Sequence, residues 1–286
     1  MIHLIDGSAY IHRAYHALPP LTTSTGIPCG AIYGLTSTLA AILSNALSGG
    51  ASHIAMVMDG GSDRRKAYFP DYKANRSAKP DDLKAQFPLA RQACEAFGIA
   101  TVSLAGEEAD DVIATYATVA KTLAMPVTIY SGDKDLMQLV GGGVQMRDLF
   151  TSRMIDEAAV EAKFGVPPHL LREVLALMGD TADNIPGVPK IGPKTAAGLI
   201  QRYGSVENCI ANARSLSGIA ARNIVEYAAQ ARLSRDLVGL VTDLPVPPLM
   251  KLAAKRPDPR QVDDFLTSLE FTGLREEVVS RMELHA

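Results

Sequence analysis

VTIYSGDKDL, residues 127–136, is the stretch of sequence that decides the fold. Its first residues are apolar or β-branched, which predicts a short buried strand. A glycine ends the strand, and two carboxylates, Asp133 and Asp135, follow at once. Residues 2–6 (IHLID) and 53–59 (HIAMVMD) have the same arrangement, because each is an apolar run that ends in an acid. The pattern predicts a sheet whose strands end in carboxylates.

Helical patterns separate these strands. Residues 31–47, 81–97 and 110–123 have the apolar spacing of helices, and residues 99–104 are a further strand candidate. Strands that alternate with helices are typical of an α/β domain with a mostly parallel sheet flanked by helices. We expect this domain over residues 1–154.

The pattern changes from about residue 155, where helical segments joined by Gly and Pro begin to dominate. The sequence therefore predicts a helical C-terminal subdomain over residues 155–286. Its predicted helices are residues 156–164, 168–178, 195–203, 220–231 and 261–269.

The composition is that of a globular protein with a sizeable core. The chain has 286 residues, of which 47% are hydrophobic and 21% charged, and no apolar run predicts a membrane span. The N-terminal MIHLIDGSAY has neither the basic nor the apolar region of a secretory signal. Cys29, Cys94 and Cys209 lack metal-site spacing and are typical of reduced thiols. We therefore expect a monomeric cytoplasmic protein with no membrane partner.

Four carboxylates follow three of the predicted strands. Asp6 ends the first strand, Asp59 ends the second, and Asp133 and Asp135 follow the strand quoted above. In a doubly wound sheet the binding crevice forms at the carboxyl ends of the strands, so these side chains are expected to converge. Each acid taken alone is equally typical of a turn.

Five further acids lie at helix boundaries. Glu108, Asp110 and Asp111 begin a predicted helix, where acids are also common simply because they complement the helix dipole. Asp180 and Asp183 precede a hairpin rich in Gly and Pro. Placed with the acids at the strand ends, they would complete a single acidic cluster.

Nine carboxylates in one crevice would repel each other, and some would be neutral unless cations lay between them. Oxygen ligands without a His or Cys set favour Mg²⁺, for which Mn²⁺ can substitute, over zinc. Two such ions about 4 Å apart can clamp an in-line attack on a phosphodiester. The nine predicted metal ligands are Asp6, Asp59, Glu108, Asp110, Asp111, Asp133, Asp135, Asp180 and Asp183.

Residues 64–79 are basic and aromatic without a clear period. Basic side chains interleaved with rings suit single-stranded nucleic acid, through charge on the backbone and stacking on the bases. A solvated loop with two or three rings in the core is an equally good interpretation of the segment alone. The residues concerned are Arg64, Arg65, Lys66, Tyr68, Phe69, Tyr72, Lys73, Arg76 and Lys79.

GVPKIGPKT, residues 187–195, resembles a phosphate-binding loop at first. Such a loop needs G-x-x-x-x-G-K-[ST], but Pro193 stands before Lys194 and removes an N–H group. A helix–hairpin–helix over residues 168–203 is the better interpretation, since free N–H groups at the second helix can take a DNA phosphate oxygen. Lys190 would add charge. A tight turn between two helices is the plainer alternative.

Several long motifs are similar to those of one known family. LIDGSAYIHRAYHALPPLTTSTG, YKANR, EADDVIATYA, SGDKDLMQLV and GDTADNIPGVPKIGPKTA resemble the 5′-nuclease (flap endonuclease) domain at the N-terminus of bacterial DNA polymerase I, which is also known as a free-standing enzyme. The resemblance runs from Met1 to about Leu274. It implies a PIN-like α/β fold and assigns the nine acids to the family's metal site.

The resemblance also divides these acids between two metals. Asp110 would lie between the two ions, with Asp111 and Asp180 nearby. One ion would take Asp59 and Glu108 directly and Asp6 largely through water, and the other would take Asp133, Asp135 and Asp183.

By the same resemblance, residues 64–92 form an arch or clamp through which a 5′ single strand reaches the metals. Lys73 and Arg76 match residues that contact and polarise the scissile phosphate, and with Asp59 and Asp110 they are the expected catalytic residues. Tyr72 is expected to stack on the flanking base. The implied DNA contacts are Arg13, Arg65, Tyr72, Lys73, Arg76, Lys190, Gly192, Lys194 and Thr195, with a K⁺ ion held by hairpin carbonyls.

The chain departs from the family's usual pattern next to the second acid. Met58 stands where a Phe is usual, and Arg64-Arg65 stands where Phe-Arg is usual. The departure bears on the assignment of Arg65 and leaves those of Lys73 and the acids unaffected.

The implied function is that of a structure-specific 5′-nuclease. It would hydrolyse DNA with 5′ ends or 5′ flaps, and RNA-primer hybrids, in replication and repair. The net charge of −3 agrees, because setting aside the nine predicted ligands leaves +6 for the rest of the chain. The alternatives are a related protein that binds branched DNA without cutting it, a single-strand RNase on a similar fold, and a metal-dependent phosphatase.

Overall fold

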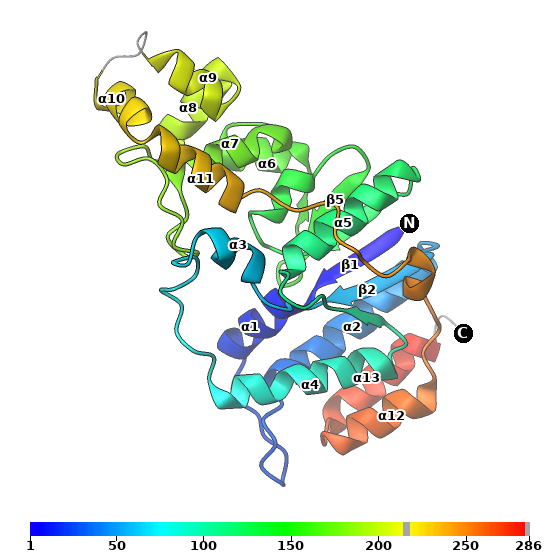
Figure 1. The fold of residues 1–286 in the computed structure, drawn as a ribbon. Helices are drawn as coiled ribbons and strands as arrows, with labels where there is room; N and C mark the ends of the chain where they lie inside the picture. The colour runs from blue at the N-terminus through cyan, green and yellow to red at the C-terminus, as the bar shows by residue number, and fades with distance from the viewer. Residues whose placement is uncertain (214–217, 284–286) are drawn as a thin grey trace.

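The computed structural model describes residues 1–213 and 218–283. A six-stranded sheet lies at its centre, in the order β3-β2-β1-β4-β5-β6 (Figure 1). Its strands run parallel except β6, which pairs antiparallel with β5 at one edge. The predicted α/β fold with a mostly parallel sheet is confirmed. The strands are β1 (Ile2–Asp6), β2 (His53–Val57), β3 (Ala100–Val102), β4 (Val127–Tyr130), β5 (Val144–Arg147) and β6 (Met154–Ile155).

The register brings the carboxyl ends of the central strands to one level. Asp6 on β1 pairs with Val57 on β2, and Ile5 pairs with Tyr130 on β4. Residues that follow these three strands therefore emerge side by side at one edge of the sheet, where α/β proteins bind their ligands.

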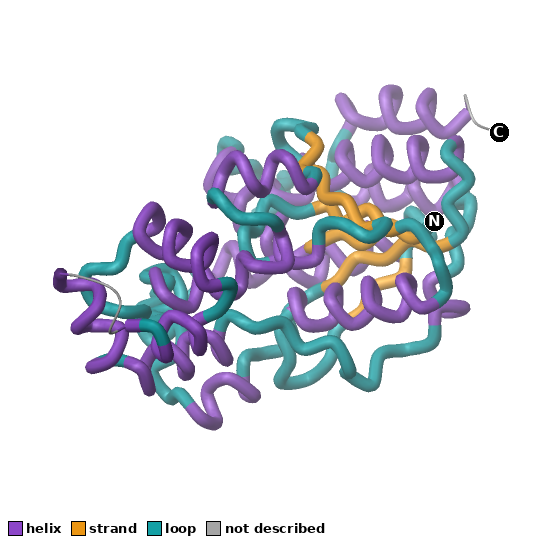
Figure 2. Tube along the Cα trace, turned by 90° about the horizontal axis from the view of Figure 1, so that it is seen from above, coloured by secondary structure: helices purple, strands orange, loops and turns teal. Residues whose placement is uncertain are grey.

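Helices cover both faces of the sheet (Figure 2). Neighbouring strand residues point to opposite faces, so Leu4 and Val57 join one core with α5, whereas Ile54 and Met56 join a second core with α1, α2 and α4. All residues of β1 are buried, as expected for a strand covered on both sides. These helices are α1 (Gly7–Ala17), α2 (Gly30–Ser48), α4 (Asp81–Ala96) and α5 (Ala109–Thr122).

Helix α2 is a core helix, although it is long and apolar enough to cross a membrane by composition alone. The sequence analysis did not count it as such a candidate. Of its apolar window, 56% is buried inside the protein. It packs against α1, α4 and α13 (Thr272–Glu283), so its apolar side chains are accounted for by the fold.

The helical subdomain lies beside the sheet (Figure 1). Helix α7 packs against α8 and α11, and it also contacts η1 (Leu136–Leu139), the turn that follows β4. The subdomain therefore rests directly on the segment that carries Asp133 and Asp135. Its helices are α6 (Glu157–Phe164), α7 (Pro168–Met178), α8 (Pro193–Tyr203), α9 (Val206–Ala211), α10 (Gly218–Glu226) and α11 (Ala228–Leu237).

Two glycines allow the chain to turn sharply between α7 and α8. Gly179 and Gly187 have φ angles of 72° and 61°, in the left-handed region that favours glycine. Their backbones also lie against each other, since a Cβ built on Gly187 would lie 2.4 Å from the nitrogen of Gly179. The hairpin between these helices is therefore closed by backbone contact, which leaves no room for side chains at either position.

The C-terminal part of the chain returns to the α/β core. After α11 the chain returns along the sheet, where His53 and Ala253 form an isolated bridge. Helices α12 (Pro259–Ser268) and α13 then pack against α4 and α2 of the α/β core. Phe265 and Phe271 belong to the same apolar cluster as those helices, so they are buried with the core. The sequence prediction groups these two helices with residues 155–286, of which 284–286 lie outside the described part of the chain.

Candidate active site

The strand-end acids are fixed by hydrogen bonds at the carboxyl edge of the sheet. Asp6 accepts from the Ala9 nitrogen at 3.0 Å and from the Ser131 hydroxyl at 2.8 Å. Asp133 receives the Asp135 N–H at 2.9 Å. Asp59 is exposed and accepts from the Ala109 nitrogen, at the start of α5, at 2.9 Å. The charges of Asp133, Asp6, Asp135 and Asp59 all act on Asp110, so the four acids predicted from strand ends lie near one another at this edge, as expected for a doubly wound sheet.

Crowding makes several of these carboxylates hard to ionise. Burial, together with the charges of Asp133 and Asp59, raises the pKa of Asp6 to about 7. Burial and the charges of Asp133 and Asp6 raise the pKa of Asp110 well above its ordinary value. Burial and the charge of Asp133 also raise the pKa of Asp135 to about 7. Such mutual repulsion is the electrostatic setting that a bound cation relieves.

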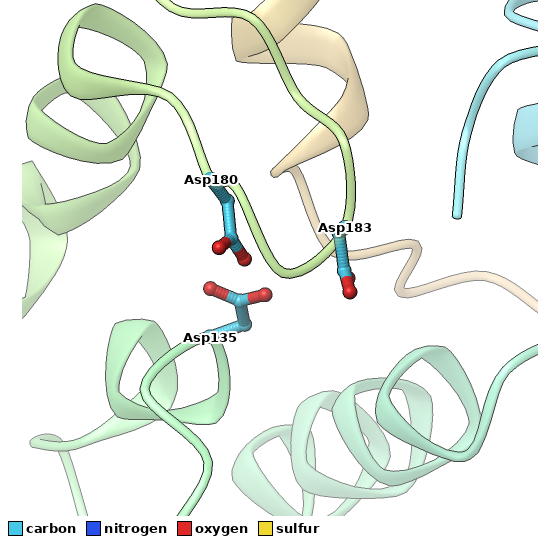
Figure 3. Close-up of side chains that lie close together, drawn as sticks. All are labelled: Asp135, Asp180 and Asp183. Atoms are coloured by element: carbon cyan, nitrogen blue, oxygen red, sulfur yellow. The ribbon is translucent and has the colours of Figure 1, made fainter. Parts of the chain in front are cut away.

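A second group of acids meets Asp135 from the helical side. Potential ligand atoms of Asp135, Asp180 and Asp183 all lie within 4.8 Å of one another. Figure 3 shows the carboxylates of Asp135 and Asp180 facing each other, with Asp183 on the following bend of the loop. Among the described residues, the buried Oδ1 atom of Asp135 accepts no hydrogen bond. A divalent cation with oxygen ligands fits this set, because it would give that oxygen a partner.

Basic side chains of the predicted arch contact the outer acids. Lys73 pairs with Glu108, and its Nζ lies 3.6 Å from Asp183 Oδ2. Arg76 also pairs with Asp183. Burial would raise the pKa values of Glu108 and Asp183, but Lys73 and its neighbouring cations outweigh this and lower both. The two predicted phosphate ligands, Lys73 and Arg76, thus lie at two of the predicted metal ligands, Glu108 and Asp183.

Lys134 also forms ion pairs with predicted metal ligands, Asp180 and Asp135. Its Nζ lies 2.7 Å from Asp180 Oδ2 and 3.6 Å from Asp135 Oδ1. The sequence analysis missed this residue, although it stands between Asp133 and Asp135 in SGDKDL. Its place between two predicted metal ligands was the signal that could have identified it.

Arg65 and Asp111 form a buried ion pair rather than an exposed contact. Arg65 is 4% exposed and Asp111 is fully buried, and their side chains are joined by bonds of 2.5 and 2.9 Å. Arg65 also donates to Glu108 and to the carbonyls of Leu237 and Gly239. The structure therefore places both side chains inside the protein, where neither is exposed to a ligand at the surface.

Tyr72 is also buried, at 3% exposure. Its hydroxyl donates to Glu108 at 2.9 Å and to Asp183 at 3.1 Å. In this arrangement the ring packs in the core, and the base stacking expected for it would require the arch to move. The sequence analysis had kept core burial of the arch rings as an alternative.

The hairpin residues are presented to solvent. Lys190, Gly192, Lys194 and Thr195 are all exposed, and Gly192 precedes the first residue of α8 in an extended conformation. A Cβ on Gly192 would meet no atom within 4 Å. The start of α8 is therefore open to a ligand that accepts hydrogen bonds.

Arg13, on α1, lines a pocket beside Asp6 and Asp133. Its guanidinium stacks 4.2 Å above the Phe150 ring and binds Asp148 at 2.9 Å. A small pocket bounded by Asp6, Arg13, Asp133 and Phe150 opens beside the acids. Asp148 and Phe150 were missed because they lie on a loop with no motif of its own.

Two family descriptions match successive parts of this chain. The one described as "5′-3′ exonuclease, N-terminal resolvase-like domain" matches residues 1–165, and "5′-3′ exonuclease, C-terminal SAM fold" matches residues 166–260. The chain belongs to the 5′-3′ exonuclease family. The family predicted from the sequence motifs is confirmed, and the chain is a nuclease of this family.

Relatives of this 5′-3′ exonuclease are of two lengths. The 5′-3′ exonuclease of Aquifex aeolicus is 37% identical over 279 residues, which cover 97% of this chain and 94% of that protein. The DNA polymerase I of Rhizobium leguminosarum is 41% identical over 293 residues, covering all of this chain but 29% of that protein. The chain thus spans less than a third of its polymerase relative.

Solved structures agree with the fold. A structure of T5 5′-exonuclease with bound divalent zinc ions matches with a TM-score of 0.70 at 22% identity, covering 100% of this chain and 99% of that one. The catalytic core of Rad2 in complex with DNA matches with a TM-score of 0.62 at 15% identity, covering 98% of this chain and 92% of that one. The predicted PIN-like fold with a helical C-terminal part is confirmed.

Proposed function

We propose that this nuclease hydrolyses DNA phosphodiesters at 5′ ends and 5′ flaps with two bound divalent ions. This rests on the crowding of Asp6, Asp110 and Asp135 at one edge of the sheet. Burial and neighbouring carboxylates raise their pKa values, which means that the ionised cluster is unfavourable without a cation. Mg²⁺ is the proposed ion, with Mn²⁺ as a substitute, because the surrounding donors are carboxylate oxygens.

One ion would be held by Asp59 and Glu108, with Asp6 acting largely through water, and Asp110 would lie between the two ions. The other would be held by Asp133, Asp135 and Asp183. The proximity of Asp180 to Asp135 and Asp183 supports its inclusion in this second group. Asp111 is better assigned to the ion pair with Arg65. When bound, the ions would acidify a water molecule and withdraw charge from the scissile phosphate.

The chain's own cations would complete the catalytic site. Lys73 and Arg76 already lie at Glu108 and Asp183. They are therefore within reach of a phosphate that the ions at these acids would hold. There they would stabilise the negative charge that develops on the phosphoryl oxygens. The products would be a 5′-phosphate and a 3′-hydroxyl.

The hairpin before α8 would hold the duplex part of the substrate. Its exposed N–H groups and Lys190 and Lys194 can bind phosphate oxygens without reading base sequence, and a K⁺ ion at the hairpin carbonyls would add charge. Solved structures with this fold in complex with DNA support DNA as the partner. We infer a monomeric enzyme of the bacterial cytoplasm that removes flaps and RNA primers during replication and repair.

Cleavage of a labelled 5′-flap duplex with Mg²⁺ tests this proposal. Asp133→Asn and Lys73→Ala should each slow cleavage by about 10²-fold or more, as loss of an electrostatic catalytic group does elsewhere. Full activity of Asp133→Asn would overturn the metal-site assignment. Binding without cleavage by the wild type would favour the non-cutting alternative, and turnover of a small phosphoester or of single-stranded RNA alone would favour the other two.

A further inference from the structure

Two asparagine side chains join the arch to the loop that carries Asp180 and Asp183. Asn75 Nδ2 donates to the Thr181 carbonyl at 2.7 Å, and Asn184 Nδ2 donates to the Asp71 carbonyl at 2.7 Å. The two bonds run in opposite directions between the same pair of segments. They therefore close a ring, which we call the asparagine clasp.

Lys73 lies inside this ring. Its backbone N–H donates to the Asp183 carbonyl at 2.9 Å, between the two asparagine bonds. Its φ angle is 56°, in the left-handed region that a long side chain adopts only where its surroundings hold it there. This backbone conformation sends the ammonium group toward Glu108 and Asp183. The clasp thus supports the conformation that aims Lys73 at the acids.

The clasp differs from the ion pairs between arch and loop because it uses no carboxylate. The ion pairs of Lys73 and Arg76 use Glu108 and Asp183, the acids that divalent ions and a phosphate would engage. Both asparagine bonds end on backbone carbonyls. They would therefore persist when the acids and cations turn to the metals and the substrate.

We propose that Asn75 and Asn184 are positioning residues that act through Lys73, holding its ammonium at a fixed place relative to Asp183 during catalysis. The inference rests on the proposed function, since a fixed Lys73 matters for chemistry only if it serves a scissile phosphate. Small displacements are costly at such a place, because a misplacement of about 1 Å can cost about 10²-fold in rate.

The variants are chosen to remove the amide donors alone. Asn75→Ala removes the N–H donor without adding a charge beside Arg76 and the loop acids. Asn184→Gly keeps the left-handed backbone that Asn184 adopts at φ 58°. The control is Asn208→Ala, which removes a bond of the same kind, from Nδ2 to the Tyr203 carbonyl at 2.8 Å, in the helical subdomain.

The kinetic test is single-turnover cleavage of the 5′-flap duplex with Mg²⁺. Each clasp variant should lower the cleavage rate by about 10- to 10²-fold while KM changes by less than about 2-fold, and the control should match the wild type. Since the two bonds form one ring, the double variant should be no more than about 3-fold slower than the slower single variant. Wild-type rates in both single variants would overturn the proposal.

A measurement on the metal-free protein separates the clasp from the proposed function. Amide hydrogen exchange over residues 70–77, which include the Lys73 N–H, should quicken by about 10-fold in both clasp variants and stay unchanged in the control. Unchanged exchange in both variants would overturn the clasp. If the wild type cut no 5′-flap DNA, the proposed function would fail, and the exchange result alone would decide the clasp.

Discussion

Arg65 illustrates how burial changes the role of a basic residue. The sequence placed it among the DNA contacts, but its guanidinium is surrounded by Asp111, Glu108 and the carbonyls of Leu237 and Gly239. It therefore ties the arch, helix α5 and the returning C-terminal chain together. A buried charge held in this way contributes to stability chiefly because its removal would leave its partners unpaired.

Arg65→Met should lower the free energy of unfolding by about 3–5 kcal/mol, because Asp111 would remain buried without its cation. Chemical denaturation monitored by circular dichroism measures this. Arg64→Met is the matched control, since Arg64 pairs with Glu107 at the surface with its side chain 46% exposed, and the loss should stay below about 1 kcal/mol. Equal effects of the two variants would refute the buried-pair interpretation, as would loss of DNA affinity at unchanged stability.

Asp135 allows a pH test of the crowded acids. In the folded metal-free protein it keeps its proton up to about pH 7, whereas an unfolded chain loses it near pH 4. The native state thus binds more protons between these values, and the free energy of unfolding falls as pH rises through this window. His3 acts with the opposite sign, since its pKa is lowered to about 4, so wild type is best compared with a single variant.

Asp135→Asn removes this titration and leaves His3 in place. In EDTA the variant should melt at the same temperature as wild type near pH 4, and at least about 2 °C higher at pH 8, where repulsion is greatest. Saturating Mg²⁺ should reverse the order at pH 8, because wild type alone keeps the full ligand set. Differential scanning calorimetry measures these melting temperatures. A variant that melts below wild type at pH 8 in EDTA would contradict the crowding of the acids.

At the scale of elements, sequence patterns predicted the hairpin before α8 but not the contacts of the arch. All residues of the hairpin are close together in the sequence. Its Gly and Pro residues were therefore enough to predict it. The arch depends on partners far away in the chain. Arg65 and Asp111 are 46 residues apart, and Asn75 and Thr181 are 106 apart, and no periodicity reports such a pair.

Strand prediction follows the same division. The strands that end in acids were predicted because each is a continuous apolar run. Strands β5 and β6 were missed because they are short: Val144–Arg147 has four residues after a glycine-rich turn, and Met154–Ile155 has two. Strands this short obtain their conformation from pairing with a neighbour more than from their own composition.

The hairpin gives a prediction about binding. Lys194→Ala should weaken binding of duplex DNA by a similar factor for every sequence and reduce the slope of log K against log salt by about 1. Fluorescence anisotropy in Ca²⁺, over a range of KCl, measures this. Lys163→Ala, which lies on α6 beside Phe164, serves as a control of equal charge. An unchanged slope for Lys194→Ala would remove the residue from the DNA contacts.

At the scale of the whole molecule, the C-terminal helices belong to the nuclease core. Phe271 is 2% exposed and packs in the cluster formed by α2 and α4, with its ring edge against Tyr33. This assignment was out of reach of the sequence, because a helix pattern shows which face is apolar and not which distant surface covers it.

Phe271→Ala should destabilise the protein by about 3–5 kcal/mol, the usual cost of removing a buried ring. Hydrogen exchange should quicken in α2 and α4 more than in α7 and α8. Ile219→Ala, at a position 58% exposed on α10, should change stability by less than about 0.5 kcal/mol. Faster exchange confined to α7 and α8 would instead place α13 with the helical subdomain.

The path of the chain has a mechanical consequence. The helical subdomain is a closed excursion, because the chain leaves the sheet at β6 and rejoins it after α11. The two connections lie apart in the sheet, at the edge strand β6 and beside β2. A body held at two separate points cannot drift as one on a single linker can, so the spacing between the duplex-binding hairpin and the acids would set where the substrate is cut.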